Sequence, residues 1–334
     1  MKSNRAAAVL SLCTHLLIAL VTVAATGREE TPPGEASRES APVDRGALEP
    51  LTIGLMPAVD SIPLIVADHE GYFVDEGLTV TLEVFRDQVY REAALQSNTI
   101  DGAVSDLVNA IRAWSNDADY RVLASTQGVF SIVTAPDSGL EQLDDWPEAP
   151  DTVETGMLAD SIVNYAATRM LEAVSLDPSR VEIVPTTQIP VRMEMVAAGE
   201  LEAAVLPEPV TRMAVGSGAH ELVSTDVLDR TPGVLIVTGR AVEEKGTALD
   251  ALLRAYNRAV EAVNADPDSY RSLIVERLAF PPPTAATMRI PTYRSAALPT
   301  PEQVADVGSW MRDRGLVDSL PPHRDIVVPE PLGR

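Results

Sequence analysis

Two runs of alternating strand-like and helix-like segments constrain the fold of this chain more than any other feature of the sequence. The first run starts at Leu51 and reads LTIGLM, IPLIVADHEGYF, LTVTLEVF, VYREAALQS and IDGAVS. The second starts at Asp151 and reads DTVETGM, SIVNYAATRMLEAV, RVEIVP, PVRMEMVAAGE and LEAAVL. Each run is a βαβαβ pattern, which predicts an α/β fold with a mostly parallel sheet and helices on its faces.

A faint internal repeat relates the two runs. The segment Arg91–Asp106 (REAALQSNTIDGAVSD) parallels Arg192–Glu208 (RMEMVAAGELEAAVLPE). Each combines a helix, a tight turn and a buried strand that ends at an acidic residue. We therefore predict two similar lobes in which Asp106 and Glu208 occupy comparable strand ends.

Two matched strands connect the predicted lobes. They are FSIVTAP, which starts at Phe130, and VLIVTGR, which starts at Val234. One leaves the first run and the other leaves the second, so we expect the chain to cross between the lobes near each of them. The predicted lobe I is discontinuous, 51–135 plus 234–330, and the predicted lobe II is 136–233.

The crossings also suggest a hinge. Gln127–Gly128 and Pro232–Gly233 lie there, and glycine permits unusual backbone dihedrals. A ligand that contacts both lobes would favour their closed arrangement.

The N-terminus resembles an export signal. Lys2 and Arg5 precede an apolar run, 6–25, that ends in small residues. We predict a signal peptide over 1–25; an uncleaved anchor is the alternative, because the run is nearly long enough to span a bilayer. Residues 26–50 are rich in Pro, Glu, Ser and Gly and are predicted to form a flexible tether. The chain is thus expected in the periplasm or tethered at the cell surface.

Composition argues against several classes of function. The formal net charge of −23 would repel phosphate backbones, which excludes nucleic acid as a partner. Lys2 and Lys245 are the only lysines and Cys13 is the only cysteine, so no cleft lysine for a Schiff base and no cysteine cluster is evident. No Walker loop, GxSxG or HExxH motif occurs. We expect neither an enzyme nor a cofactor or bound metal.

The stretch LEAAVLPEPV raises a specific question. The apolar strand must end at Pro207, because proline cannot donate to a strand ladder, and Glu208 then stands between two prolines. Ligands of open parallel α/β sheets bind beyond the carboxyl ends of strands. Glu208 is therefore either a ligand contact or the N-cap of the next helix, VTRMAV.

Other strand and helix ends supply further candidate ligand-binding residues. They are Asp60, Ser61, Phe85, Arg86, Ser105, Asp106, Gln127, Asp160 and Ser161. Asp160 and Ser161 begin a helix, where free N–H groups attract acceptors, and a plain N-cap role for Asp160 is the alternative.

The candidate cleft is rich in carboxylates. Asp60, Asp106, Asp160 and Glu208 would repel a sulfonate or nitrate and suit a ligand that carries N–H groups. An anionic ligand would need Arg86 or Arg192 to point inward. Three aromatic rings could stack on a flat ligand: Phe85, Phe130 and Tyr165. The alternative for each is packing in the core.

Several blocks in the right order resemble the SsuA/THI5-like (NMT1-type) solute-binding proteins. They are LTIGLMPAVDSIPLIVADHEGYFVDEGLTVTLEVF, ALQSNTIDGAVSDLVNA, VLPEP and WMRDRGLV, and the likeness covers Leu51–Val327. The resemblance implies a two-lobed periplasmic-binding-protein fold of type II. It also implies a monomer that delivers a small molecule to the membrane permease of an ABC importer.

The resemblance implies a range of ligands. Known classes include aminopyrimidine thiamine precursors, riboflavin, alkanesulfonates, taurine, nitrate and aromatic acids. Combined with the acidic cleft, it favours a thiamine-type aminopyrimidine. A sulfonate or nitrate-type anion, or an aromatic acid, is the alternative. A eukaryotic branch that makes the thiamine pyrimidine uses a pyridoxal phosphate lysine, a consumed histidine and a cysteine-rich iron motif, which this sequence lacks.

Overall fold

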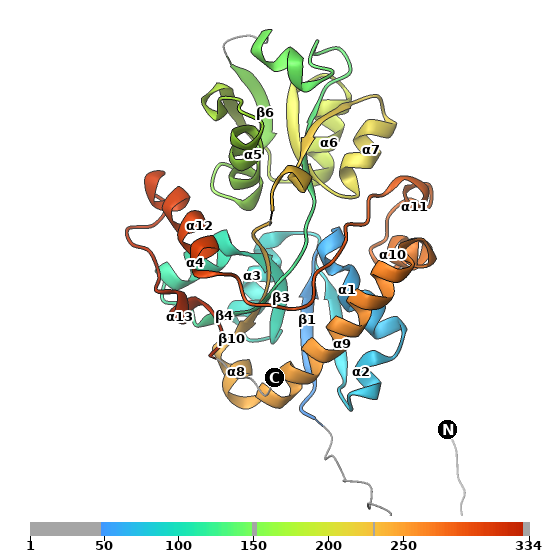
Figure 1. The fold of residues 1–334 in the computed structure, drawn as a ribbon, viewed down its shortest axis with the longest axis vertical. Helices are drawn as coiled ribbons and strands as arrows, with labels where there is room; N and C mark the ends of the chain where they lie inside the picture. Colours follow the sequence, from blue (N-terminus) through green and yellow to red (C-terminus); the bar gives the residue numbers. More distant parts are fainter. Residues whose placement is uncertain (1–47, 149–151, 230, 330–334) are drawn as a thin grey trace, which may run out of the picture. The chain divides into compact units, whose positions relative to one another are not determined.

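The computed structural model describes residues 48–148, 152–229 and 231–329. The predicted signal peptide and most of the predicted tether lie outside these described residues. Within them, ten strands form two five-stranded sheets with the orders β2-β1-β3-β10-β4 and β7-β6-β8-β5-β9 (Figure 1). The predicted two-lobed α/β fold is confirmed.

The first sheet consists of β2 (Val80–Val84), β1 (Leu51–Leu55), β3 (Gly102–Asp106), β10 (Gly233–Thr238) and β4 (Tyr120–Ser125). The second consists of β7 (Val181–Pro185), β6 (Val153–Met157), β8 (Ala203–Pro207), β5 (Phe130–Thr134) and β9 (His220–Ser224). Each sheet contains one strand antiparallel to both of its neighbours, β10 in the first and β5 in the second. The other pairings are parallel.

The pairing of β5 leads us to propose a different boundary between the lobes. The predicted lobe I extends to residue 135, but Phe130–Thr134 pairs with β8 and β9 of the second sheet. An apolar strand does not reveal which sheet supplies its partners. We therefore propose 48–127 plus 232–329 as lobe I and 128–229 as lobe II.

Helices cover both sheets. In lobe I they are α1 (Ile62–His69), α2 (Tyr72–Asp75), α3 (Gln88–Gln96), α4 (Leu107–Ser115), α8 (Gly239–Glu244), α9 (Gly246–Ala265), α10 (Arg271–Arg277), α11 (Thr284–Thr287), α12 (Pro301–Asp313) and α13 (His323–Ile326). In lobe II they are α5 (Ile162–Ala173), α6 (Ile189–Ala197) and α7 (Val210–Gly216).

The long helix α9 shows how the core of lobe I forms. Leu249, Leu252, Tyr256, Val260 and Val263 recur every three or four residues, so they share one face, and each is at most 2% exposed. This face packs against α1, which lies beside α9 in Figure 1. Full burial of one such side chain stabilises the fold by about 1.5–3 kcal/mol.

Two buried arginines confirm the internal repeat. Arg91 in α3 donates from Nη1 to the carbonyl oxygen of Val104 at 2.9 Å. Arg192 in α6 donates from Nη1 to the carbonyl oxygen of Val205 at 2.7 Å. Both arginines therefore tie the helix to the following strand at matching positions.

The sheet register refines this repeat by one residue. Ile53 of β1 pairs with Gly102, and Thr155 of β6 pairs with Ala203, so Gly102 and Ala203 are equivalent. Asp106 then corresponds to Pro207. The expectation that Asp106 and Glu208 occupy comparable strand ends is wrong by one position, because Asp106 is the last residue of β3 whereas Glu208 directly follows the last residue of β8.

Candidate functional site

The loop after β1 places Asp60 beside the first crossing between the sheets. Asp60 lies in the short 3-10 helix Val59–Ser61, directly before α1. A Cβ atom on Gly128 would lie 3.6 Å from the Asp60 Oδ2 atom. The Asp60 carboxylate therefore faces the segment that leads from β4 to β5.

The environment of Asp60 disfavours its charge. Its Oδ1 atom is buried and accepts no hydrogen bond from the described residues. Burial raises the pKa of Asp60 to about 6, although the Arg91 guanidinium lowers it, and the nearby Asp106 carboxylate raises it further. A ligand that donates a hydrogen bond here would favour the ionised form.

Asp106 lies at the end of β3 and caps α4. Its Oδ1 atom accepts from the Asn109 backbone N–H and its Oδ2 atom accepts from Asn109 Nδ2, both at 2.8 Å. Burial raises the pKa of Asp106 to about 6, opposed by the backbone hydrogen bond from Asn109. The neighbouring Ser105 Oγ accepts from Arg91 Nη2 at 3.2 Å. Both predicted site residues thus have partners within lobe I.

The remaining candidates of lobe I differ in exposure. Ser61 is fully buried, and its hydroxyl donates to the carbonyl oxygen of Met56 at 2.8 Å. Phe85 is half-buried against the core of lobe I, and Arg86 is exposed. Gln127 Oε1 accepts from the Arg294 backbone N–H at 2.8 Å, so this side chain fixes the first crossing to the C-terminal part of lobe I.

The glycines at the two crossings have ordinary dihedrals. Neither Gly128 nor Gly233 has a positive φ, contrary to the reason given for placing a hinge there. At Gly233 the requirement is space, since a Cβ atom would lie 2.7 Å from Thr126 Oγ1. Both crossings connect the sheets, as expected, and the hinge itself stays a prediction.

The start of α5 differs from the expectation for Asp160. Ser161, not Asp160, is the N-cap residue, so the N-cap alternative for Asp160 is wrong. The Ser161 hydroxyl donates to the carbonyl oxygen of Leu158 at 2.8 Å. Asp160 is exposed, and its backbone carbonyl accepts from Arg112 of α4, a contact between lobe II and lobe I.

Glu208 is fully buried, like Ser61. Its side chain is 0% exposed, and its Oε1 atom accepts from Arg212 Nε at 2.9 Å. Burial raises the pKa of Glu208, and hydrogen bonding and charge from Arg212 oppose that effect. Its Oε2 atom is buried and accepts no well-formed hydrogen bond from the described residues. The N-cap of α7 is Pro209, without a side-chain cap, so the capping alternative for Glu208 is wrong.

Two side chains considered for ligand contact already have other partners. Arg192 Nη1 and Nη2 donate to the carbonyl oxygens of Val205 and Thr186. Tyr165 donates its hydroxyl to Asp306, and its ring packs edge-on against Trp310 with centroids 5.6 Å apart. Phe130 is half-buried against the core of lobe II.

Sequence reasoning missed two tyrosines near Asp60. The Tyr293 hydroxyl donates to the carbonyl oxygen of Val59 at 2.6 Å. The Tyr256 hydroxyl is buried without a hydrogen-bond partner among the described residues. Burial raises the pKa of both tyrosines, and the Asp60 carboxylate adds to this effect. Nothing in the local sequence connects these residues, because they lie nearly 200 positions or more beyond Asp60.

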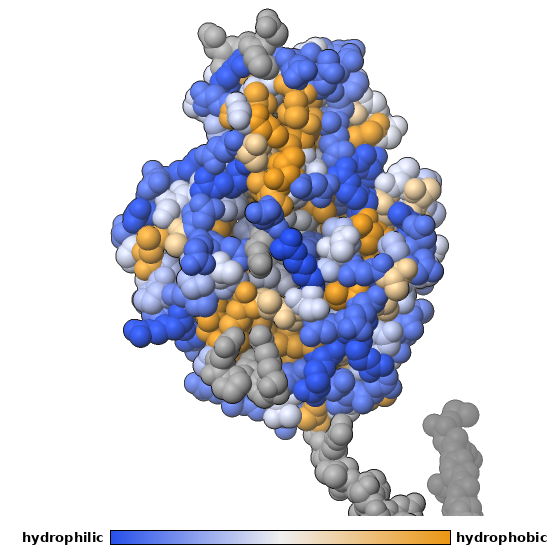
Figure 2. Space-filling model, viewed as in Figure 1, coloured by the Kyte–Doolittle hydropathy of each residue, from blue (hydrophilic) through white to orange (hydrophobic). Residues whose placement is uncertain are grey.

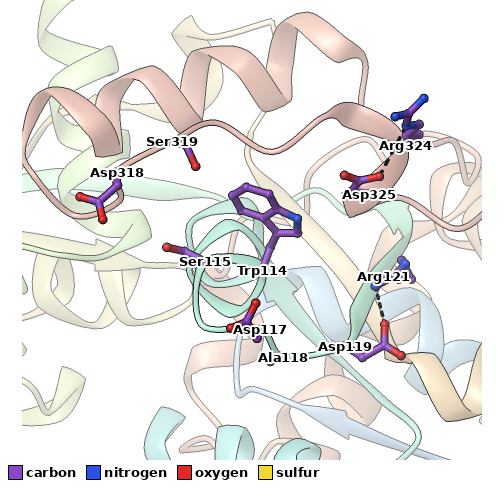
Figure 3. A pocket seen from close by; sticks show the side chains of 10 residues that line it. All are labelled: Trp114, Ser115, Asp117, Ala118, Asp119, Arg121, Asp318, Ser319, Arg324 and Asp325. Carbon is purple, nitrogen blue, oxygen red and sulfur yellow. Dashed lines mark ion pairs between the residues drawn. The ribbon is translucent and has the colours of Figure 1, made fainter.

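Two cavities lie near the start of β4, at the edge of the first sheet opposite to the strand end that carries Asp106. One, of about 520 Å³, is lined by Trp114, Asp119, Arg121 and Asp318 among others (Figure 3). The other, of about 270 Å³, includes Tyr120 at the first residue of β4. Neither contains a predicted site residue. We place the candidate site at the strand-end carboxylates and not at these cavities, because ligands of α/β sheets bind beyond the carboxyl ends of strands.

Other observations limit the chemistry of the described residues. They contain no group of three or more His, Cys, Asp or Glu side chains placed to hold a metal ion. No helix among them is both long and apolar enough to cross a membrane. The face drawn in Figure 2 is mostly hydrophilic, with hydrophobic patches, as expected for a strongly charged chain.

The two lobes, joined by two crossings, have the fold of the periplasmic binding proteins. The chain belongs to the NMT1-like family, which matches residues 44–279. No curated protein sequence matches it.

Solved structures agree with this fold. The ligand-binding component of an ABC-type import system from Staphylococcus aureus, with zinc bound, has a TM-score of 0.70 at 15% identity over 84% of this chain and 97% of its own. The aliphatic sulphonate binding protein SsuA from Escherichia coli has a TM-score of 0.67 at 16% identity, over 84% of this chain and 92% of its own. The desulfurization enzyme DSZB has a TM-score of 0.61 at 15% identity, over 85% of this chain and 97% of its own.

Proposed function

We propose that this protein is the extracytoplasmic solute-binding component of an ABC importer and binds a small molecule between its lobes. One observation carries the proposal: Asp60 in lobe I and Glu208 in lobe II each have a buried carboxylate oxygen without a well-formed hydrogen bond. Such an oxygen costs free energy unless a donor reaches it. A bound solute with N–H groups would supply the donors from between the two lobes.

We propose a neutral or cationic amino-heterocycle as the ligand, with a thiamine-type aminopyrimidine as the leading candidate. Asp60, Asp106 and Glu208 offer acceptors, and Phe85 and Phe130 are the half-buried rings able to stack. The Arg192 guanidinium already donates to two carbonyl oxygens. This disfavours the sulfonate alternative that relies on Arg192 and leaves it the exposed Arg86.

An enzyme resembling the thiamine-pyrimidine synthases is a weaker alternative. Such an enzyme needs a lysine in the cleft, but Lys245 Nζ contacts Asp101 at 2.8 Å and the carbonyl oxygen of Pro50, which directly precedes β1. That contact is at the amino end of β1, away from Asp60. Cys13, the only cysteine of the chain, lies outside the described residues.

The proposed location is outside the cytoplasmic membrane, in the periplasm or tethered at the cell surface, with a membrane permease as partner. Cell fractionation tests this part. Mature chain recovered in the cytoplasm with its N-terminus intact would argue against export.

A thermal-shift screen tests the ligand class. The screen compares aminopyrimidines, thiamine, flavins, polyamines, sulfonates and aromatic acids. A ligand at a hundred times its dissociation constant should stabilise the protein by about 2.7 kcal/mol. We expect stabilisation by an amino-heterocycle, and its loss in Asp60→Asn. Stabilisation by sulfonates alone would reject the acidic site.

A further inference from the structure

Glu208 belongs to a chain of alternating charges that we name the Arg289 cluster: Glu208, Arg212, Glu221 and Arg289. Arg212 Nε donates to Glu208 Oε1 at 2.9 Å, and Arg212 Nη2 donates to Glu221 Oε2. Arg289 Nη2 lies 2.9 Å from Glu221 Oε1 and 2.8 Å from Oε2. The buried carboxylate at the end of β8 is thus connected to Arg289 through two intermediate side chains.

The Arg289 cluster spans the two lobes. Three members lie in lobe II: Glu208 directly follows β8, Arg212 belongs to α7 and Glu221 belongs to β9. Arg289 stands between Met288, which is 2% exposed in the core of lobe I, and Ile290, which packs against that core. The Glu221–Arg289 pair is therefore an ion pair between the lobes.

The pairs of the Arg289 cluster are partly shielded from water. The side chains of Glu208, Arg212, Glu221 and Arg289 are 0%, 21%, 16% and 30% exposed. Charge-assisted hydrogen bonds are stronger than neutral ones, and shielding from water strengthens the attraction. Separation of the lobes would remove Arg289 from Glu221 and leave Arg212 as the only cation shared by two carboxylates.

Arg289 also acts on Glu208 itself. Burial raises the Glu208 pKa, and the charge and backbone N–H of Arg289 are among the groups that lower it. Glu208 is thus bonded to Arg212 of its own lobe and connected through Glu221 to Arg289 of the other. This arrangement explains a carboxylate held between two prolines better than a helix cap does.

We propose that the Arg289 cluster is a latch: Arg289 of lobe I binds Glu221 of lobe II, which also accepts from Arg212, and holds the lobes together. Arg289 Nη1 contacts a second carboxylate of lobe II, Asp226 Oδ2, at 2.8 Å and adds to the latch. The latch does not depend on a ligand. Its connection to solute capture rests on the proposed function, because a ligand donor at Glu208 Oε2 would keep that carboxylate ionised and attractive to both arginines.

A distance measurement in the ligand-free full chain tests the latch. Spin labels are placed at Val74→Cys in lobe I, where the residue is 77% exposed, and at Glu200→Cys, exposed in lobe II, in a Cys13→Ser background. We expect a short interlobe distance in the parent. Arg289→Gln should shift at least half of the population to a longer distance, and Glu208→Gln should shift part of it.

A matched control separates the latch from a general effect of lost charge. Arg258 pairs with Asp75 within lobe I, so Arg258→Gln should leave the distance unchanged. Arg289→Lys, which keeps the charge, should retain part of the short-distance population, and circular dichroism checks that each variant folds. An unchanged distance in Arg289→Gln, or an equal shift in Arg258→Gln, would overturn the proposal.

A second arm separates this proposal from the proposed function. Calorimetric titration with 4-aminopyrimidine should show at least fivefold weaker binding in Arg289→Gln. The fold-loss of affinity in the double variant Glu208→Gln, Arg289→Gln should be smaller than the product of the fold-losses in the two single variants. Equal affinity in wild type and Arg289→Gln would contradict the connection of the latch to solute capture. If wild type does not bind the probe, the proposed ligand class fails, while the distance measurement still decides the latch.

Discussion

The hydroxyl of Tyr165 in α5 donates to Oδ2 of Asp306 in α12 at 2.5 Å, which joins lobe II to lobe I. Arg169 of α5 donates to the same carboxylate at 2.6 Å. A hydrogen bond to a charged group contributes about 1.5–3 kcal/mol, and an exposed ion pair contributes less.

Asp306→Asn should therefore lower the free energy of unfolding by about 1–3 kcal/mol. Urea unfolding measures this, with Asp313→Asn as the control, since Asp313 is exposed and its Arg312 contact is 3.7 Å long. Equal stability of the two variants would show that this interlobe contact adds nothing.

Arg192 should be a structural residue. Arg192→Lys removes the planar donor pair that reaches Val205 and Thr186, and we expect a loss of about 2–3 kcal/mol in unfolding free energy. Denaturant unfolding measures the loss, and binding per mole of folded protein should not change. Normal stability with lost anion binding would instead support the sulfonate alternative.

Asp106 should reveal its capping role through the difference between two substitutions. Asp106→Ala removes the acceptors for Asn109 and should cost about 0.5–2 kcal/mol, whereas Asn is itself a good N-cap. Asp106→Asn should therefore keep most of the stability. If Asp106→Asn keeps stability but weakens ligand binding, the residue also contacts ligand; if it alters neither, the residue is a cap alone.

Asp60 should make the ligand-free protein less stable as the pH rises. Burial raises its pKa from 3.8 to about 6, so the folded state binds more protons than the unfolded state between these values. The contribution of Asp60 to stability is then highest below pH 3.8 and falls until the pH passes about 6. From pH 4.5 to 7.5 the loss due to Asp60 is on the order of 2 kcal/mol.

The comparison with Asp60→Asn isolates this contribution. Urea unfolding at both pH values should show a smaller loss in the variant than in wild type. An identical pH dependence in both proteins would mean that the Asp60 pKa is not raised. A ligand that donates to the ionised carboxylate should bind more weakly below pH 6.

The sequence predicted the sheets better than the side-chain contacts. Hydrophobic periodicity predicts strands and helices locally, and the paired arginines of the repeat lie within 13 residues of their acceptors. The partners of β5 could not be predicted, because an apolar strand fits either sheet. The same holds for the Glu221–Arg289 pair, whose members are 68 residues apart.

The central claim, that one solute is held by carboxylates of both lobes, is tested most directly by calorimetric titration of the best ligand from the thermal-shift screen into wild type, Asp60→Asn and Glu208→Gln. Loss of one charged hydrogen bond of about 1.5–3 kcal/mol should weaken binding by roughly tenfold or more in each variant. Arg258→Gln, with its ion pair inside lobe I, serves as the control and should bind like wild type. Wild-type affinity in either carboxylate variant would contradict the claim that both lobes contribute a carboxylate to the site.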